Sequence, residues 1–241
     1  MEINQKKLVI KFIPIIQARM GSSRLPGKSL MNIGNYRLID WVIEYAKENF
    51  SDELIFIATT HSKQDDSLVK YLSSKDINIF RGSESDVFSR FEHIAKNFNQ
   101  DDIIVRFTAD NPIKYNCIIQ KMKSKILTDN IDYCCLENLS KLSVEFIRIK
   151  LIDQIKSMEY FDKYDKEHVT WNIRNKLSCN KLIIDQIKEN MKPELDKLIT
   201  IDNAEDILFV EKLIKKLNIK PGEELNLTNL YNSINESVNQ N

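Results

Sequence analysis

Three cations, Arg19, Arg24 and Lys28, are concentrated in one short stretch of the chain that contains no acidic residue. The stretch follows an apolar run at residues 8–16, which we expect to form a buried strand. Gly21 lies among the cations, and glycine lets a backbone approach a ligand closely because it has no Cβ. Backbone amides with arginine and lysine at the carboxyl end of a strand suit an anion with several oxygens. The stretch therefore predicts a triphosphate site, with an ordinary loop of solvated cations as the alternative.

The spacing of this loop is not that of the P-loop, Gly-x-x-x-x-Gly-Lys-Ser/Thr. Gly21 and Gly27 are separated by one residue too many for that motif. A phosphate site here would therefore belong to another class of nucleotide-binding protein.

A carboxylate is expected at the same edge of the sheet. Residues 102–108 predict a second buried strand, and Asp110 comes shortly after it. Folds of the α/β class hold ligands beyond the carboxyl ends of their strands, and Mg²⁺ prefers one or two carboxylates together with phosphate oxygens. Asp110 is therefore a candidate magnesium ligand. The alternative is that Asp110 caps a turn beside Asn111 and Pro112.

Strands and helices alternate along the first half of the chain, as βαβ units require. The apolar patterns predict further strands at residues 53–60 and 77–80, and helices at 36–50, 67–74, 115–127 and from Ser85 onward. We therefore expect an α/β fold with a mostly parallel sheet. The length of 241 residues suits a single domain, 1–241.

The regular alternation of strands and helices ends at residues 131–175, which we interpret as an excursion from the main sheet. The pattern there and beyond predicts strands at 131–135, 144–149, 182–187 and 198–201, and helices at 150–160, 165–175 and 204–217. The excursion is expected to cover the carboxyl edge of the sheet and to carry acceptor contacts, a dimer surface or both. The polar tail after Pro221 is expected to be loosely held.

Charge and composition exclude several classes of function. Lysine plus arginine and aspartate plus glutamate number 35 each, so no overall field draws the chain toward nucleic acid or an anionic membrane. No apolar segment approaches the roughly 20 residues that span a bilayer, and the first residues lack the apolar core of a signal peptide. We expect a cytoplasmic protein. The four cysteines have no C-x-x-C spacing and indicate reduced thiols.

Residues 17–28 closely resemble the signature of the cytidylyltransferases related to spore coat polysaccharide synthesis proteins, which are relatives of the enzymes that make CMP-activated acidic sugars. The resemblance implies a three-layer α/β/α fold of the GT-A, or nucleotide-diphospho-sugar transferase, type. It also implies CTP as the nucleotide and Mg²⁺ as the cofactor. Within this stretch the residues implied in nucleotide binding are Gln17, Ala18, Arg19, Gly21, Ser22, Arg24 and Lys28, with Arg19, Arg24 and Lys28 as the catalytic cations.

The metal ligands are implied by two further matches. Residues 106–112 resemble the pattern Arg-x-Thr-Gly-Asp-x-Pro, with Ala109 in place of the glycine, and residues 202–206 are similar to an Asp-Thr-Pro-Glu-Asp turn. In related enzymes the two aspartates of these motifs share one ion. The resemblance therefore implies that Asp110 and Asp202 converge on one Mg²⁺. Glu205 and Asp206 lie in the first turn of the following helix, where acids are favoured, and are expected to cap it.

Three weaker motif matches imply which residues contact the nucleotide base and the acceptor. Residues 81–90 resemble Arg-Gly-Ser-x-x-Asp-Val-Leu-x-Arg, which implies that Arg81, Gly82 and Ser83 contact the nucleotide; Arg90 and Asp86 form either a structural brace or part of that site. Two short matches to the spore coat subgroup imply Glu145, Glu167 and His168 as acceptor-binding residues, and His168 could deprotonate the acceptor. A helix-terminal acid beside a packed histidine is the alternative.

The combined expectation is a nucleotidyltransferase that moves CMP from CTP onto an acidic sugar or a phosphorylated small molecule and releases pyrophosphate. A homodimer is possible, since dimers are common among the relatives. The alternatives are a GT-A-type glycosyltransferase that uses a nucleotide-sugar, and a nucleotide-binding relative without turnover. The adjacent pairs Asp65-Asp66 and Asp101-Asp102 lack the Asp-x-Asp spacing of such glycosyltransferases.

Overall fold

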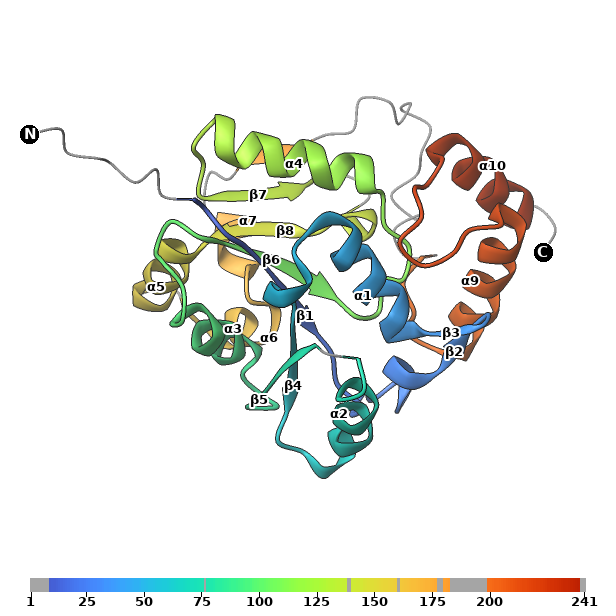
Figure 1. Cartoon of the computed structure of the whole chain (residues 1–241), viewed down its shortest axis with the longest axis horizontal. Helices are drawn as coiled ribbons and strands as arrows, with labels where there is room; N and C mark the ends of the chain where they lie inside the picture. The colour runs from blue at the N-terminus through green and yellow to red at the C-terminus, as the bar shows by residue number, and fades with distance from the viewer. Residues whose placement is uncertain are drawn as a thin grey trace, which may run out of the picture.

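The computed structural model describes residues 9–75, 77–137, 140–159, 161–176, 180–182 and 199–238. Within them, a seven-stranded sheet with the order β5-β4-β1-β6-β8-β7-β9 runs through the centre of the molecule (Figure 1). Its strands are β1 (Phe12–Gln17), β4 (Phe56–Thr60), β5 (Asn78–Gly82), β6 (Ile103–Thr108), β7 (Tyr133–Leu136), β8 (Glu145–Arg148) and β9 (Asn180–Leu182). The short strands β2 (Asn32–Ile33) and β3 (Tyr36–Arg37) pair separately.

The direction of the strands brings several carboxyl ends to one edge. β5, β4, β1 and β6 run parallel to one another, whereas β8 is antiparallel to both β6 and β7. The predicted α/β fold with a mixed, mostly parallel sheet is therefore confirmed. Residues 18–28, which we call the cationic loop, follow β1, and Asp110 follows β6. These two parts of the predicted site therefore lie side by side.

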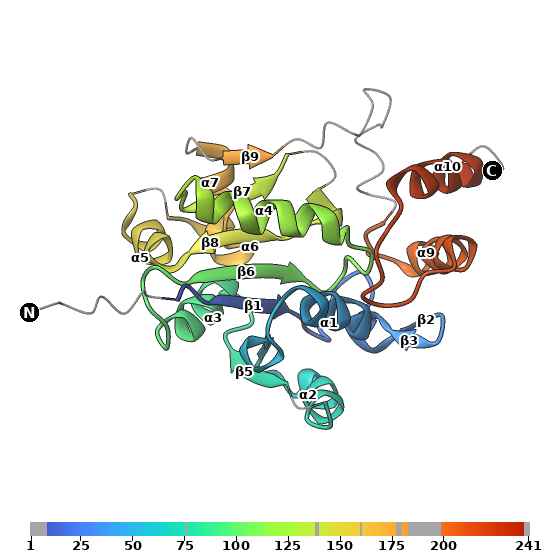
Figure 2. The same ribbon diagram turned by 45° about the horizontal axis from the view of Figure 1, so that its top comes forward.

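Helices cover both faces of the sheet and form the outer two of three layers (Figures 1 and 2). One apolar core lies under α1 (Leu38–Asn49), α2 (Asp66–Leu72), α4 (Asn116–Thr128), α9 (Ala204–Leu217) and α10 (Leu227–Val238). The other lies under α3 (Val87–Ala95), α5 (Ile149–Ser157) and α7 (Trp171–Lys176), with α6 (Lys163–His168) beside α3. The strands are apolar on both sides because both faces are covered, so Cys134 and Cys135 of β7 enter different cores.

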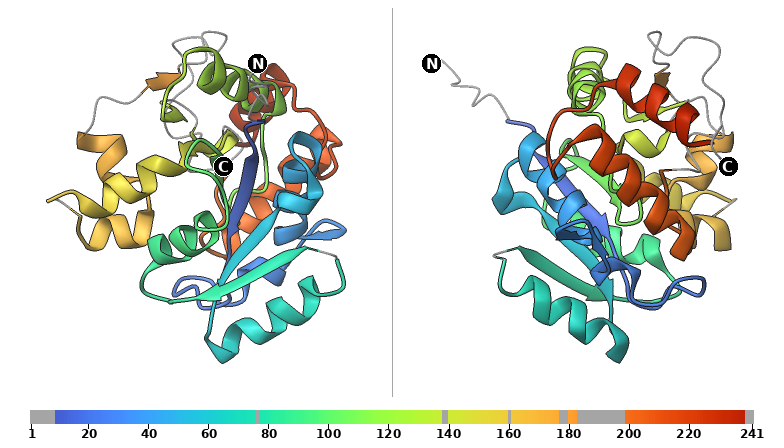
Figure 3. Two further views of the ribbon diagram at one scale, coloured as in Figure 1. Left: turned by 60° about the vertical axis from the view of Figure 1, so that its left-hand side comes forward. Right: turned by 90° about the vertical axis from the view of Figure 1, so that its right-hand side faces the viewer.

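The carboxyl-terminal segment differs from its prediction. Residues 227–238 form α10, which lies beside α9 (Figure 3), and Leu230 and Ile234 are only 3% and 1% exposed. The expectation of a loosely held tail was wrong. Leu227, Leu230, Tyr231 and Ile234 have the spacing of an apolar helix face, which the surrounding asparagines and serines obscured.

Two smaller predictions were wrong, and a third lies almost entirely outside the described residues. The helix predicted at 165–175 is divided into α6 and α7 at Val169, whose φ is 63°. The carboxylate of Asp165 joins the two pieces, because its Oδ1 accepts a hydrogen bond of 2.9 Å from the backbone N–H of Asn172. Residues 199–201 form no strand, and the strand predicted at 182–187 lies outside the described residues except for Leu182, which ends β9.

The excursion predicted at residues 131–175 contributes to the main sheet as well as to its edge. β7 and β8 extend the sheet beyond β6, and α6 then packs beside α3 and α7. No helix in the described part of the chain is both long enough and apolar enough to cross a bilayer.

Candidate active site

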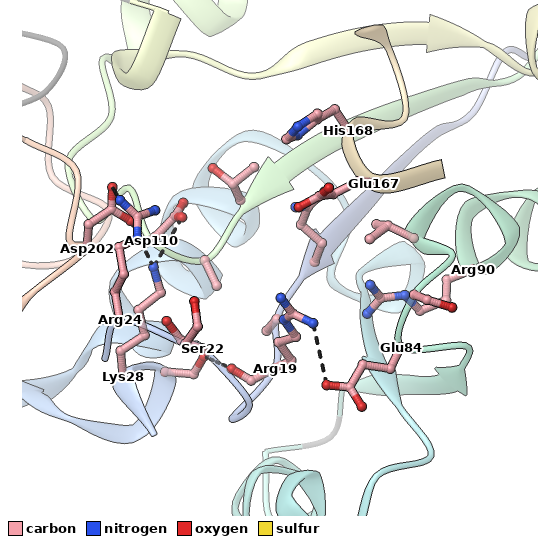
Figure 4. A pocket seen from close by; sticks show the side chains of 18 residues that line it. Arg19, Ser22, Arg24, Lys28, Glu84, Arg90, Asp110, Glu167, His168 and Asp202 are labelled. Carbon is pink, nitrogen blue, oxygen red and sulfur yellow. Dashed lines mark hydrogen bonds and ion pairs between the residues drawn. The ribbon is translucent and has the colours of Figure 1, made fainter. Parts of the chain in front are cut away.

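A cavity of about 540 Å³ opens at the carboxyl ends of β1 and β6. Polar and charged side chains from five separate segments line most of it (Figure 4). The lining residues are Gln17, Ala18, Arg19, Ser22, Ser23, Arg24, Lys28, Ser29, Glu84, Ser85, Val87, Arg90, Thr108, Ala109, Asp110, Glu167, His168 and Asp202. Most of the residues predicted for the nucleotide and the metal therefore share one cavity, whereas Gly21 is not among those that line it.

The cationic loop is held in shape by bonds to its own backbone and to the next βα unit. Gly27 has a φ of 78°, a left-handed conformation that favours glycine, and its N–H donates to the carbonyl of Met20 over 2.8 Å. The N–H of Met20 in turn donates to Asp65 Oδ1 over 2.7 Å. Lys28 directly follows Gly27 and begins a short 3₁₀ turn. The turn therefore directs Lys28 back into the cavity.

Lys28 lies between the two predicted metal ligands. Its Nζ is 3.3 Å from Asp110 Oδ2 and 3.5 Å from Asp202 Oδ1, and it donates to the carbonyl of Ile201 over 2.7 Å. The backbone joins the same loops, because the N–H of Ile201 donates to the carbonyl of Asp110 over 2.9 Å. Two aspartates far apart in the sequence are thus brought to one ammonium group (Figure 4).

The charge of Asp110 is stabilised where it lies. Burial raises the pKa of the Asp110 carboxyl, but the positive charges of Lys28 and Lys141 and hydrogen bonds from Thr108 and Lys28 outweigh it. The net pKa of Asp110 is lower than its ordinary value. Asp110 is therefore an anion at neutral pH.

The two aspartates fit a magnesium ion that also has phosphate ligands. They already hold one cation, the ammonium of Lys28, and their oxygens are the hard donors that Mg²⁺ prefers. No cluster of three or more His, Cys, Asp or Glu side chains within the described residues is arranged to hold a metal. Asp110 and Asp202 could thus hold Mg²⁺ only with oxygens from another source, as an ion carried by a triphosphate requires.

The two arginines of the loop lie at different ends of the cavity. Arg24 pairs with Asp202, with Nη1 to Oδ2 at 2.9 Å, whereas Arg19 reaches Glu84 at 3.5 Å. The side chains of Arg24 and Arg19 are 68% and 44% exposed. Ion pairs this exposed contribute little to stability, so both arginines can meet an anionic ligand at small cost.

The loop after β5 contributes to the cavity through residues other than those predicted. Arg81 donates to the carbonyls of Thr60 and Ser62 over 2.7 and 2.9 Å and pairs with Asp66 at 2.8 Å. Neither Arg81, Gly82 nor Ser83 lines the cavity, whereas Glu84, Ser85, Val87 and Arg90 do. The part of the loop that lines the cavity therefore begins at Glu84, directly after the residues 81–83 that the resemblance implied.

Arg90, for which the sequence left open a structural brace or a place in the site, lines the cavity. It is only 2% exposed, and its Nη1 donates to the carbonyl of Ala58 over 3.0 Å. Asp86 caps α3 by accepting from the N–H of Ser89, and Arg90 bonds to Ala58 instead of forming the alternative Asp86–Arg90 brace. Burial and the nearby charge of Arg19 lower the pKa of Arg90 to about 10, which still leaves the guanidinium charged at neutral pH.

A second cavity of about 380 Å³ adjoins the first, since Thr108 and His168 line both. Glu145, predicted for the acceptor, lies in this second cavity, and Glu167 lies in the first. Its lining is Arg106, Thr108, Asn111, Cys135, Leu136, Ser140, Lys141, Ser143, Val144, Glu145, His168, Thr170, Trp171, Arg174 and Asn175. The three predicted acceptor residues thus lie around the junction of two connected cavities.

Glu145 is surrounded by donors. Its carboxylate accepts hydrogen bonds from Arg106 over 2.9 Å, from Thr170 over 2.7 Å and from Arg174 over 3.4 Å. Burial raises the pKa of Glu145, but Arg106, Arg174 and the Thr170 hydroxyl together bring it below its ordinary value. Arg106 also donates through Nε to Gln17 Oε1 over 3.0 Å. Glu145 therefore stays ionised and holds two arginines at the cavity wall, a role that suits positioning better than proton transfer.

His168 and Glu167 are exposed at the end of α6. The His168 ring lies 5.6 Å from the ring of Trp171, which is 42% exposed. No carboxylate orients His168 among the hydrogen bonds found in the described residues. The prediction that His168 binds or deprotonates the acceptor is therefore compatible with its position and stays a prediction.

The fold and the arrangement of this site define the class of protein. A mixed sheet between two helical layers, with the ligand cavity at the carboxyl ends of the parallel strands, is the fold of the nucleotide-diphospho-sugar transferases, and solved nucleotidyltransferases share it. Comparison of the sequence with protein families then matches residues 13–235 to the family described as cytidylyltransferase. The chain belongs to the cytidylyltransferase family.

Individual relatives agree with this assignment. The spore coat polysaccharide biosynthesis protein SpsF of Bacillus subtilis is 30% identical over 86% of this chain and 88% of its own. The 3-deoxy-manno-octulosonate cytidylyltransferase of Saccharophagus degradans is 33% identical over 48% of this chain and 46% of its own. A solved cytidylyltransferase from Leptospira borgpetersenii superimposes with a TM-score of 0.80, at 25% identity and 96% coverage of both chains.

Proposed function

We propose that the protein transfers CMP from CTP to an acidic sugar or a phosphorylated small molecule and releases pyrophosphate, in the synthesis of a surface polysaccharide precursor. The observation that carries the proposal is the position of Lys28 between Asp110 and Asp202, within a cavity that three arginines also line. This arrangement provides cations for a triphosphate and hard ligands for its metal. The family and the names of the relatives support cytidine as the nucleoside.

The residues of the chain act mainly by binding and alignment. Lys28 and Arg24, which pair with the aspartates, would exchange part of those contacts for phosphate oxygens, and Arg19 would offset charge on the departing pyrophosphate. Asp110 and Asp202 would hold a magnesium ion, which would act there as a Lewis acid that neutralises charge on the phosphates. Phosphoryl chemistry of this kind depends on positioning and charge neutralisation more than on covalent work by the protein.

The acceptor would occupy the second cavity and reach the α-phosphate past Thr108 and His168, which border both cavities. Arg106 and Arg174, fixed by Glu145, give this cavity a positive wall that suits an anionic acceptor. His168 is the candidate to take the proton of an attacking hydroxyl. We further propose a cytoplasmic protein, with a homodimer as a possible assembly.

Pyrophosphate release tests this function directly. The protein is incubated with Mg²⁺, one of CTP, UTP, ATP or GTP, and a panel of acidic and phosphorylated sugars. Release that requires CTP and an acceptor supports the proposal. Turnover of ready-made nucleotide-sugars alone would instead indicate a glycosyltransferase, and CTP binding without turnover under any condition would indicate a relative without catalysis; both results contradict the proposal.

A further inference from the structure

Lys114 is a lysine whose side chain lies inside the protein. It is only 1% exposed, although an ammonium group loses its hydration on burial and needs hydrogen-bond partners in return. Its Nζ donates to the carbonyls of Lys141 and Ser143, each over 2.9 Å. Lys114 lies between β6 and α4, whereas both carbonyls belong to the connection between β7 and β8. A buried charge therefore holds one connection against the other.

The backbone strengthens the same junction. The N–H of Tyr115 donates to the carbonyl of Leu142 over 2.8 Å, so the carbonyls of residues 141–143 all accept from Lys114 or its neighbour. The segment forms a 3₁₀ turn over Ser140–Leu142. Its position thus depends on two successive residues that are distant in the sequence.

The segment held in this way forms part of the wall of the second cavity. Ser140, Lys141 and Ser143 all line that cavity, and Lys141 is the charged member. The positive charge of Lys141 also contributes to the lowered pKa of Asp110, a residue that lines the nucleotide cavity. Lys141 therefore lies near the place where the two cavities meet, which is where an acceptor would reach the α-phosphate.

Lys141 adds to the positive charge that the two arginines of this wall provide. Arg106 and Arg174 share the carboxylate of Glu145, so Glu145 balances part of their charge. Lys141 contributes its charge on the side of Asp110 instead. An ammonium group is a compact point charge that suits a carboxylate or a phosphate. The position of Lys141 therefore suits an anionic group carried by the acceptor.

We propose that Lys141 binds the anionic group of the acceptor and that Lys114 is its positioning residue, an inference that rests on the proposed function. Lys114 fixes the backbone of Lys141 and so keeps the Lys141 side chain in the cavity wall. Loss of Lys114 leaves two carbonyls without their donor, and the segment then no longer has a fixed position. The acceptor loses a charge-assisted contact although Lys141 itself is unchanged.

Binding of anionic sugars tests the inference by isothermal titration calorimetry. The protein is first saturated with Mg²⁺ and α,β-methylene CTP, an analogue that cannot release pyrophosphate. The probes are N-acetylneuraminate, D-glucuronate and glucose 1-phosphate. The neutral controls are the methyl esters of the two acidic sugars, and glucose. The wild type is expected to bind at least one anion more tightly than its neutral control.

Lys141→Ala should weaken binding of that anion about tenfold or more, because a hydrogen bond between charged groups is lost, and Lys141→Arg should retain most of the affinity. Lys114→Met should weaken the same anion about tenfold. Lys114→Met added to Lys141→Ala should weaken it no further, because Lys114 acts through Lys141. A purely structural role of Lys114 would not depend on Lys141 in this way.

Lys121→Ala is the matched control, since Lys121 is exposed on α4 and lines neither cavity. Circular dichroism establishes that each variant is folded. If Lys114→Met does not fold, Lys114→Gln replaces it, because the glutamine amide can still donate to a carbonyl. Its effect on the anion should again disappear when Lys141 is alanine.

The outcomes separate the inference from the function beneath it. A wild type that binds the CTP analogue, with the anion bound equally well by Lys141→Ala or no more tightly than its neutral control, contradicts the inference only. A loss in Lys114→Met that persists in full without Lys141 contradicts the positioning role. A wild type that binds no CTP analogue contradicts the proposed function and, with it, the inference. Losses confined to the anion and shared by the two lysines support it.

Discussion

Asp110 and Asp202 meet at the ammonium group of Lys28, with Oδ2 of the first at 3.3 Å and Oδ1 of the second at 3.5 Å from Nζ. Two like charges would not be held this close without a cation between them. The backbone bond from Ile201 to Asp110, 2.9 Å long, fixes the two loops together. The site is therefore arranged to hold positive charge at one point, and four predictions follow from this and the neighbouring contacts.

Replacement of Lys28 by alanine should reduce turnover about a hundredfold or more, a typical loss for a group that stabilises charge in the transition state. Steady-state pyrophosphate release measures the effect, and circular dichroism establishes that the variant is folded. Lys47→Ala is the matched control, since Lys47 lies on α1 outside the active-site cavity. A rate near that of the wild type would remove Lys28 from the mechanism.

Replacement of Asp202 by asparagine should raise the Mg²⁺ concentration for half-maximal rate at least about tenfold, because one of two charged ligands becomes neutral. The measurement is a magnesium titration at saturating CTP. Glu205→Gln is the control, since Glu205 lies in the first turn of α9 and does not line the cavity. The same titration curve for wild type and Asp202→Asn would reassign the second ligand.

Replacement of Glu145 by glutamine should lower the free energy of unfolding by about 3 kcal/mol, because two buried or half-buried arginines lose their shared carboxylate. Urea denaturation measures the change. Glu53→Gln, at an exposed position, should change stability by less than about 0.5 kcal/mol. The KM for the acceptor should also rise, since Arg106 and Arg174 are no longer fixed. A stability equal to that of the wild type would show that Glu145 does not organise this wall.

The Asp65 carboxyl gives a prediction for acid. Burial raises the pKa of Asp65, but hydrogen bonds from Thr60, Met20 and Thr59 lower it by more. The net pKa is therefore below the ordinary 3.8. Because the folded-state pKa is lowered, the stabilisation from Asp65 is complete above pH 3.8 and is lost as the pH falls through the folded-state pKa.

Asp65→Asn should therefore be less stable than the wild type near neutral pH. The difference in stability between the two proteins should shrink only as the pH falls below 3.8. Thermal unfolding of both proteins across the acid range measures it. Asp153→Asn, at an exposed carboxylate on α5, is expected to follow the wild type throughout. A difference between Asp65→Asn and wild type that does not depend on pH would contradict the assignment.

The sequence predicted what local patterns encode. Alternating apolar runs predicted the α/β fold, and the position of Asp110 after a buried strand predicted its place at the sheet edge. Capping was also predictable, since Asp206 accepts from the backbone of Asn203 and Asp202 at the start of α9 as a helix-terminal acid should. In each case neighbouring residues determine the outcome.

What could not be predicted depends on contacts between distant segments. Nothing local indicates that Arg90 is buried against Ala58 rather than paired with Asp86 one turn away. The three donors around Glu145 come from separate elements. The resemblance could therefore identify Glu145 as a site residue but could not predict which residues donate hydrogen bonds to it. The sequence named Arg90 as a candidate but not its burial, for which Gly82 is a weak signal, since a glycine there leaves space for a side chain eight positions later.

The most direct test of the account is to locate the metal with CTP bound. Crystals grown with CTP and Mn²⁺, measured for anomalous scattering, report the ion without reference to activity. We expect one strong peak within about 2.0–2.3 Å of oxygens from both Asp110 and Asp202, with the triphosphate against Lys28. A peak that contacts neither aspartate, or a triphosphate bound away from Lys28, would contradict it.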